Sequence, residues 1–323
     1  MSKSLMILGG SGYFGKTFLS SFVDGKLLKY NISKLILVSR KNKYKNNKFK
    51  KKIFFLKKDL STAKNLPYAD YIIYGAEYVD AQKILSNYKS KKDLKTFNNV
   101  FNNILSKKKF KKTKIIYLSS GSVYLNRNSK IRKKIDEKGK IFTRKFHSLT
   151  KFSEIYTNNK IIGEEMTKNL SIKYGIKTSI ARCFAQIGPH LPLNKQYIIG
   201  NFIYSILKNK PLKIFEKSSV SVFRSFMYAD DLVSWLLKIL KSSSLSTPIY
   251  NVGSDKPISI WSLGKYFEKK FKIKFLFPKQ KKNFFDFYIP SIKKAKRNLS
   301  LKINYNLSQS ILLTLKKLGY YYK

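Results

Sequence analysis

The fold class is decided by the stretch Leu5-Met-Ile-Leu-Gly9-Gly-Ser-Gly12-Tyr-Phe-Gly15. A short apolar run ends in three glycines spaced three residues apart, and a helix-like segment follows. One glycine permits a tight turn, another lets the backbone approach a pyrophosphate, and another lets the helix pack closely on the strand. The N–H groups at the start of the helix then face the phosphates. The stretch therefore predicts a dinucleotide site, with contacts from Gly9, Gly12, Tyr13, Phe14 and Gly15.

Apolar runs and helical segments alternate through the first half of the chain, as in a parallel sheet covered on both faces. The expected strands are Leu5–Leu8, Leu35–Val38, Ile53–Leu56, Tyr71–Tyr74, Ile115–Leu118 and Thr178–Phe184. We therefore predict an α/β fold with a doubly wound, Rossmann-like parallel sheet. Residues 1–188 are expected to form the dinucleotide-binding domain, with some later segments returning to it, and residues 189–323 mainly a smaller substrate lobe.

The alternation loosens after Gly188-Pro189, where the substrate lobe is expected to begin. Much of it is expected to form from a helix at Ile198–Leu207, a strand at Leu212–Phe215 and a helix at Asp231–Leu240. One more strand and turn is expected at Ile249–Gly253 and one more helix at Ile260–Phe271. The polar, lysine-rich stretch from Asn126 to Lys145 is expected to be a long loop.

Composition indicates a globular protein of the cytoplasm without a membrane span. No apolar run reaches about 18 residues, and Leu5–Leu8 is too short for a signal sequence. The one cysteine, Cys183, cannot form an internal disulfide, which fits a reducing compartment.

The net charge of +50 points toward polyanions, but its make-up favours a solvated surface. Only seven of the 67 basic residues are arginine, the residue best suited to bidentate phosphate recognition. The densest cluster, Arg40 to Lys58, has ten basic residues in nineteen positions. We expect only non-specific, salt-sensitive polyanion binding.

Two further segments carry side chains suited to chemistry. Tyr156 and Lys160 are four residues apart at the start of a predicted helix, which places them on one face. The strand at Ile115–Leu118 leads into Ser119-Ser-Gly-Ser-Val-Tyr124, which delivers hydroxyls to the carboxyl edge of the sheet, where open α/β folds bind ligands.

Together with the glycine corner, these residues resemble the extended short-chain dehydrogenase/reductase family, and most of all its nucleotide-sugar epimerases, dehydratases and reductases. Glu164, which follows the Tyr156 and Lys160 pair, is similar to the family pattern. Three later segments match in order and spacing: Arg182-Cys-Phe-Ala-Gln-Ile-Gly-Pro189, Arg224-Ser-Phe-Met-Tyr-Ala-Asp-Asp231 and Tyr250-Asn-Val-Gly253.

The resemblance implies catalytic roles for Ser120, Tyr156 and Lys160. A phenol, with a pKa near 10, is a poor base unless a neighbouring cation favours the phenolate, and Lys160 would supply that field while also binding the cofactor ribose. Tyr156 would exchange a proton with a sugar hydroxyl as hydride moves to or from the cofactor. Ser120 would hydrogen-bond the reacting oxygen.

The substrate expected from the resemblance is a nucleotide sugar, contacted by Ser122 and by Arg224 at its phosphates. A salt bridge is the alternative role for Arg224. A homodimer is also expected, and no metal site.

Departures from the family pattern narrow the reaction. Gly121 and Ser122 stand where the family's 4,6-dehydratases carry an Asp-Glu pair and its decarboxylases a Glu. Ala185 replaces an asparagine expected to contact the diphosphate, and the Ser120 to Tyr156 interval is longer than usual. Without a carboxylate after Ser120, we expect no elimination of water.

The cofactor is expected to be NADP in preference to NAD. The second strand runs into Ser39-Arg40-Lys41 with no acidic residue to bind the ribose hydroxyls or repel a 2′-phosphate. Ser39 and Arg40 would bind that phosphate, although Arg40 is alternatively just the first member of the basic loop. Asp59-Leu60 lies where such sheets contact adenine, and a helix cap is the equal alternative there.

The function predicted from the sequence is that of a nucleotide-sugar oxidoreductase or isomerase working at C4, a 4-keto reductase or 4-epimerase, which supplies surface polysaccharide. A nucleic-acid-binding protein on a retained dehydrogenase scaffold is the alternative from another class. A redox-sensing regulator that binds cofactor without catalysis is a third.

Overall fold

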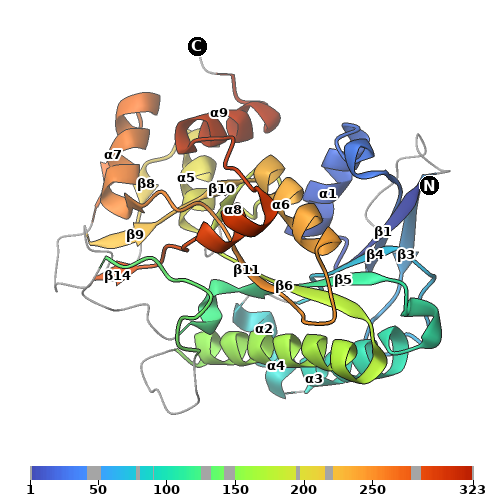
Figure 1. The fold of residues 1–323 in the computed structure, drawn as a ribbon. Helices are drawn as coiled ribbons and strands as arrows, with labels where there is room; N and C mark the ends of the chain where they lie inside the picture. The colour runs from blue at the N-terminus through green and yellow to red at the C-terminus, as the bar shows by residue number, and fades with distance from the viewer. Residues whose placement is uncertain are drawn as a thin grey trace. The chain divides into compact units, whose positions relative to one another are not determined.

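The computed structural model describes residues 2–41, 52–77, 81–89, 91–124, 132–141, 150–193, 197–214, 221–277 and 285–321. Within these residues the largest sheet has seven strands in the order β11-β6-β5-β4-β1-β2-β3 (Figure 1). All the pairings among β1 to β6 are parallel. The strands are β1 (Lys3–Leu8), β2 (Ile32–Ser39), β3 (Ile53–Lys57), β4 (Tyr71–Tyr74), β5 (Lys114–Ser120), β6 (Lys177–Cys183) and β11 (Ile249–Val252).

Helices cover both faces of this sheet, and the doubly wound α/β fold predicted from the sequence is confirmed. Figure 1 shows α2 (Ala81–Lys89), α3 (Lys92–Phe97) and α4 (Lys151–Tyr174) on one face, and α1 (Tyr13–Val23) and α6 (Ala229–Lys241) on the other. The remaining helical turns of this region are η1 (Leu28–Tyr30), the π-helix η3 (Asn98–Leu105), η4 (Lys108–Phe110) and η5 (Gly121–Val123).

Burial explains why the strands form where they do. Leu5 to Leu8 of β1 are fully buried, and β5 is buried from Ile115 to Ser120. Strands covered on both faces read as continuous apolar runs, as these do. Beneath β4 and β5, the rings of Tyr74 and Tyr117 lie 5.7 Å apart between their centroids. They form one core cluster with Phe97 of α3 and Phe101 of η3.

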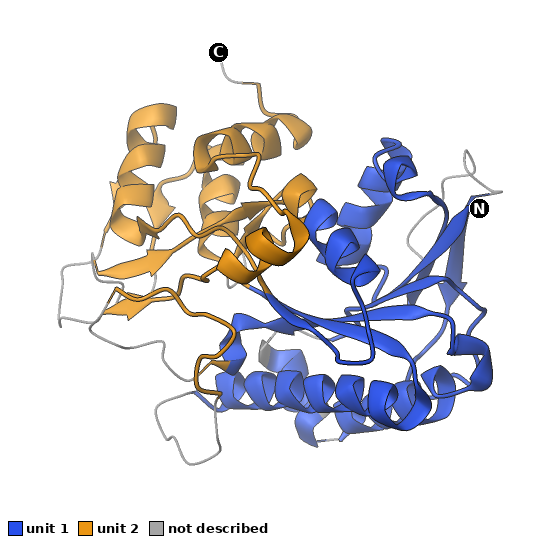
Figure 2. Ribbon diagram, viewed as in Figure 1, with its two compact units in different colours: residues 1–123, 142–183, 233–250 blue, residues 124–141, 184–232, 251–323 orange. Residues whose placement is uncertain are grey.

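The chain folds into two compact units (Figure 2). Unit 1 holds residues 1–123, 142–183 and 233–250, and unit 2 holds residues 124–141, 184–232 and 251–323. The expectation that the helix at Asp231–Leu240 belongs to the substrate lobe is wrong for most of its length. Residues 233–250, which include most of α6, belong to unit 1, because the segment after α6 packs there: Ser243 binds Ser179 and the Ile115 carbonyl.

The described part of the expected long loop, residues 132–141, belongs to unit 2. Ile135 pairs with Pro290 in an isolated bridge, and its carbonyl oxygen accepts a hydrogen bond from the Asn251 side chain. Glu137 accepts a hydrogen bond from the Asn251 backbone N–H at 2.9 Å. The rest of the stretch from Asn126 to Lys145 lies outside the described residues, as do Phe215 of the expected strand and most of the basic cluster after Lys41.

Unit 2 is built from short strands and helices. Three small sheets join its described strands in the orders β12-β9-β14, β10-β7 and β13-β8. Its elements are β7 (Gln186–Ile187), α5 (Ile198–Leu207), β8 (Leu212–Lys213), β9 (Val222–Arg224), β10 (Met227–Tyr228), β12 (Ile258–Ser259), α7 (Ile260–Phe271), β13 (Phe275–Leu276), β14 (Asp286–Phe287), α8 (Lys293–Leu299) and α9 (Leu307–Lys317). Among the described helices of the whole chain, none combines the length and the apolar character needed to cross a membrane.

Candidate active site in unit 1

Helix α4 places Tyr156 and Lys160 on one face, as their spacing predicts. The helix begins after Thr150, whose side-chain oxygen accepts the Ser153 N–H, and it ends at Gly175, which has a φ of 64°. The Lys160 ammonium lies 5.6 Å from the centroid of the Tyr156 ring. Tyr156 is half-buried, and Lys160 is only 6% exposed. The pair thus combines a partly accessible phenol with a cation largely shielded from water.

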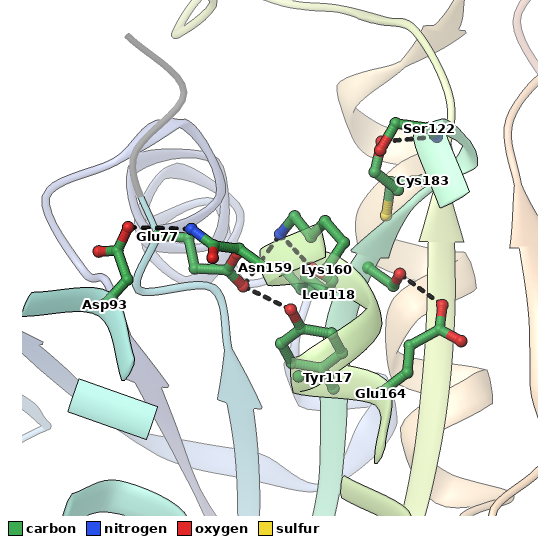
Figure 3. A network of polar contacts seen from close by, with 12 residues as sticks. Glu77, Asp93, Tyr117, Leu118, Ser122, Asn159, Lys160, Glu164 and Cys183 are labelled. Atoms are coloured by element: carbon green, nitrogen blue, oxygen red, sulfur yellow. Dashed lines mark hydrogen bonds and ion pairs between the residues drawn. The ribbon is translucent and has the colours of Figure 1, made fainter. Parts of the chain in front are cut away.

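Lys160 is anchored to the end of β5, the strand that leads to the serines (Figure 3). Its Nζ donates to the carbonyl oxygen of Leu118 at 2.7 Å and to Oε1 of Glu77 at 3.0 Å. Leu118 is two residues before Ser120 in the same strand. The structure therefore ties the helix that carries Tyr156 to the sheet edge that carries Ser120.

Glu77 follows β4 and accepts a second hydrogen bond, from the Tyr117 hydroxyl at 2.7 Å. Burial raises the pKa of the Glu77 carboxyl, while the charge of Lys160 and the two hydrogen bonds act in the opposite direction. Burial, followed by the charge of Glu77, raises the pKa of the Tyr117 phenol well above its usual value. Lys160, Glu77 and Tyr117 form one connected polar group under the candidate site.

The serines after β5 have separate environments. Ser119 donates to Glu164 at 2.6 Å, whereas the Ser120 hydroxyl oxygen accepts the Ser122 N–H at 3.1 Å. The Ser122 hydroxyl is buried and has no hydrogen-bond partner among the described residues. Gly121 and Ser122 are buried in η5, directly beyond the strand. Ser120 and Ser122 thus lie at the carboxyl edge of β5, where the sequence predicts contacts with substrate.

Glu164 and Arg182 form a second buried ion pair one turn further along α4. Arg182 donates through Nε at 2.8 Å and through Nη2 at 2.6 Å, one bond to each carboxylate oxygen. Both side chains are no more than 6% exposed. Neighbouring Cys183 is buried, and burial raises the pKa of its thiol to about 12, with Lys160 acting in the opposite direction. At neutral pH this thiol stays protonated.

The glycine corner has the geometry that a dinucleotide needs. Gly9 has a φ of 98°, and a Cβ there would lie 2.6 Å from the carbonyl oxygen of Gly75. A Cβ at Gly15 would overlap the carbonyl oxygen of Gly10. Only glycine fits at these two positions, so α1 begins close against the strands, with Tyr13 and Phe14 in its first turn. The corner fits the nicotinamide dinucleotide that the sequence predicts.

The residues expected to contact the adenosine end have protein partners. The Asp59 carboxylate accepts the N–H and the hydroxyl of Ser61 and lies 3.3 Å from Lys92. Asp59 thus caps the turn that follows β3, which includes the buried Leu60. Within the described residues 52–77 no helix begins at this turn, so the helix cap expected as the alternative to an adenine contact is replaced by a turn cap. The Ser39 hydroxyl donates to the carbonyl oxygen of Lys41, and Arg40 is exposed.

In unit 2, Arg224 is held by Asp286. Its Nη2 donates to the carboxylate at 2.6 Å, Nη1 donates to the Phe223 carbonyl, and the guanidinium lies 5.7 Å from the centroid of the Tyr288 ring. The salt bridge that was the alternative role for Arg224 is therefore present. In the described residues of both units, no group of three or more His, Cys, Asp or Glu side chains could hold a metal ion.

Sequence reasoning missed Glu77 and Tyr117. Glu77 is one of only 17 acidic residues in the chain, and it lies three residues after the apolar strand Tyr71–Tyr74. A carboxylate at the carboxyl end of a central parallel strand in so basic a chain was a detectable signal. Tyr117 gave no such signal, because a tyrosine inside an apolar strand is usually part of the core.

Comparison with known proteins shows the family. The model of the NAD dependent epimerase/dehydratase family matches residues 5–253, and the chain belongs to this family. Curated relatives include UDP-glucuronate 4-epimerase 1 of Arabidopsis thaliana, 31% identical over 135 residues, which are 38% of this chain and 31% of that protein. UDP-glucuronic acid decarboxylase 1 of Xenopus tropicalis is 29% identical over 105 residues, 32% of this chain and 24% of that protein. The chain thus spans about a third or less of the length of these two relatives.

Solved structures show the same fold over nearly the whole chain. An epimerase of Methanothermobacter thermautotrophicus has a TM-score of 0.74 at 19% identity, covering 98% of this chain and 92% of that one. The UDP-glucose 4-epimerase of Thermotoga maritima, solved with UDP-glucose, has a TM-score of 0.72 at 16% identity, covering 98% of both chains. The dTDP-glucose 4,6-dehydratase of Streptomyces venezuelae, solved with NAD, has a TM-score of 0.78 at 14% identity, covering 98% and 96%.

Proposed function

We propose that this member of the family acts at C4 of a nucleotide-activated sugar, as a 4-epimerase or 4-keto reductase that uses NAD or NADP. The observation that carries the proposal is the placement of Tyr156 and Lys160 on one face of α4, with Lys160 fixed to the strand that ends in Ser120. The glycine corner around Gly9 and Gly15 supports it by fitting a dinucleotide. The nicotinamide would accept hydride from, and return hydride to, the sugar carbon.

In this proposal Tyr156 exchanges the proton of the sugar hydroxyl. The positive charge of Lys160, 5.6 Å from the ring centroid, favours the phenolate that can take the proton. Ser120 holds the reacting oxygen by a hydrogen bond, so that the carbon and its proton acceptor stay aligned. The same phenol returns the proton when the ketone is reduced, which makes the cycle reversible.

The two candidate reactions rest on different observations. The similarity to UDP-glucuronate 4-epimerases and to a UDP-glucose 4-epimerase supports epimerisation of a UDP-sugar. The absence of an acidic residue after β2, with Ser39 and Arg40 in its place, supports NADP, and NADP supports a reductase. Elimination and decarboxylation are disfavoured because Gly121 and Ser122 supply no carboxylate beside the reacting carbon.

Incubation with UDP-glucuronate, UDP-glucose and UDP-N-acetylglucosamine tests the proposal, with NAD and with NADP in separate reactions. Proton NMR would follow inversion at C4. A 4-keto sugar with reduced NADP would test the reductase. We expect C4 inversion or ketone reduction, without release of water or carbon dioxide. Elimination at a catalytic rate would contradict the assignment, since it would require an acid other than residues 121 and 122.

We also propose a setting for this activity. The product would enter surface polysaccharide, and the enzyme would work in the cytoplasm as a homodimer, with Ser122 and Arg224 contributing to substrate binding. Release of the Asp286 salt bridge would free the Arg224 guanidinium for the diphosphate. The large positive charge would bring only non-specific polyanion binding, which falls as salt rises.

A further inference from the structure

A carboxylate is the charged partner of Lys160 inside unit 1. Glu77 Oε1 lies 3.0 Å from Lys160 Nζ, and the side chains are 9% and 7% exposed. Figure 3 shows both side chains meeting between β4, β5 and α4. Water and salt screen a pair at this depth far less than a surface pair, so each charge acts strongly on its neighbours.

Two of the three N–H donors of the Lys160 ammonium have acceptors among the described residues. One donor goes to Glu77, in the segment after β4, and one to the Leu118 carbonyl in β5. Two fixed acceptors restrict the ammonium far more than one would, and the third N–H remains for a bound hydroxyl. Glu77 therefore determines where Lys160 can offer that donor.

The position of Glu77 is itself fixed by a hydrogen bond from Tyr117. The Tyr117 hydroxyl donates to the same oxygen that Lys160 contacts. A Cβ at position 163 of α4 would overlap this hydroxyl, so Gly163 leaves the space that Tyr117 occupies. Helix α4 thus carries Tyr156 and Lys160 and also Gly163, which leaves space for the Tyr117 hydroxyl that binds Glu77.

Several ionisable groups surround the pair, and among the described residues Glu77 is the carboxylate that forms an ion pair with Lys160. The ring centroids of Tyr117 in β5 and Tyr156 in α4 lie 5.4 and 5.6 Å from the Lys160 ammonium. The charge of Lys160 also acts to lower the pKa of the Cys183 thiol in β6. On the other side, Asp93 of α3 and Tyr74 of β4 interact electrostatically with Glu77. Asp93 in turn accepts a hydrogen bond from Asn159.

We propose that Glu77 is a positioning residue for Lys160, and that its negative charge sets the pH range over which Tyr156 works by offsetting the field of Lys160. The inference rests on the proposed function for its catalytic part. A lone lysine would favour the phenolate more strongly than a lysine paired with a carboxylate does. Glu77 thus adjusts the basicity of Tyr156 without touching the substrate.

Glu77→Gln tests this directly, because the amide retains an acceptor for Lys160 and removes only the charge. The low-pH limb of the kcat/KM profile should move to lower pH by about half a unit or more, since the net positive field on Tyr156 rises. Glu165→Gln makes the same charge change on the exposed side of α4 and should leave the limb in place. An unchanged limb in Glu77→Gln would overturn the inference while leaving the proposed function intact.

A second measurement needs neither cofactor nor turnover. Thermal unfolding of Glu77→Gln, Lys160→Met and the double variant forms a cycle in which the double variant should lose less stability than the two single losses added together. Additive losses would show that the two charges do not interact and would overturn the inference. If the wild type acts on no nucleotide sugar, the proposed function fails, and this cycle still decides whether Glu77 and Lys160 are coupled.

Discussion

Two buried ion pairs lie one turn apart on α4, and they differ in how the cation contacts the carboxylate. Arg182 donates hydrogen bonds to both carboxylate oxygens of Glu164, and Ser119 donates to the same carboxylate. Lys160 contacts only one oxygen of Glu77 and keeps one N–H free of acceptors among the described residues. We call Glu164–Arg182 the closed pair, because both carboxylate oxygens are bound by the cation, and Glu77–Lys160 the open pair, because one lysine N–H has no acceptor among the described residues.

We infer from this difference that one ion pair of α4 mainly stabilises the fold and that the other contributes to catalysis. The bidentate contact between Arg182 and Glu164 joins α4 to β6 through both carboxylate oxygens. A lysine held by two acceptors is fixed in position and still able to bind a hydroxyl. We therefore expect changes at Glu164 and Arg182 to reduce stability, and changes at Tyr156, Lys160 and Glu77 to alter catalysis.

The largest expected loss of stability comes from breaking the closed pair. Arg182→Met leaves the Glu164 carboxylate buried without its partner, which should lower the free energy of unfolding by about 3–5 kcal/mol. Urea denaturation followed by circular dichroism measures the loss. Lys265→Met, which breaks the exposed pair with Glu268, is the matched control and should lower it by about 1 kcal/mol or less. Similar losses in both variants would refute the distinction.

A smaller effect is expected from filling the space under the open pair. Gly163→Ala would force the Tyr117 hydroxyl away from α4, and overpacking of this kind lowers the free energy of unfolding by about 1–3 kcal/mol. The displaced hydroxyl should also lose its bond to Glu77, so the pH profile should move in addition to the denaturation midpoint. Asn158→Ala, on the same helix, should change neither. A stable variant with an unchanged profile would show that Tyr117 does not hold Glu77.

The smallest predicted effect lies at the cofactor end. Arg40→Ala should reduce any preference for NADP over NAD by about tenfold, as expected for the loss of one charge-assisted hydrogen bond. Fluorescence titration with the reduced forms of both cofactors measures the preference, and Lys41→Ala is the neighbouring control. If the wild type binds NAD as tightly as NADP, the preference for NADP is wrong and the epimerase gains support over the reductase.

The sequence predicted the elements whose signal is local. The strand ending at Leu8, the glycine corner and the Tyr156 and Lys160 pair each depend on periodicity or spacing within one segment, and the structure places them as expected. Most of helix α6 was assigned to the wrong unit. Its amphipathic pattern shows that one face is buried, but the pattern does not show which unit covers that face. That information resides in contacts such as the one between Ser243 and Ser179, which are 64 residues apart.

The partner of Lys160 could not be predicted for the same reason. Glu77 is 83 residues before Lys160, and the two meet only because β4 and β5 are neighbours in the sheet. The roles of Asp59 and Arg224 were left open because a carboxylate or a guanidinium serves a ligand and a salt bridge equally well. In the structure each has protein partners, Ser61 and Lys92 for one and Asp286 for the other.

If Tyr156 transfers the proton at the sugar hydroxyl, removal of its hydroxyl oxygen should abolish most of the turnover. Tyr156→Phe should bind the cofactor with unchanged affinity and lose turnover by about 100-fold or more. Tyr174→Phe makes the same change at the exposed end of α4 and should retain full turnover. Turnover of Tyr156→Phe within about tenfold of the wild type would contradict this role of Tyr156, because general acid–base catalysis contributes more than that.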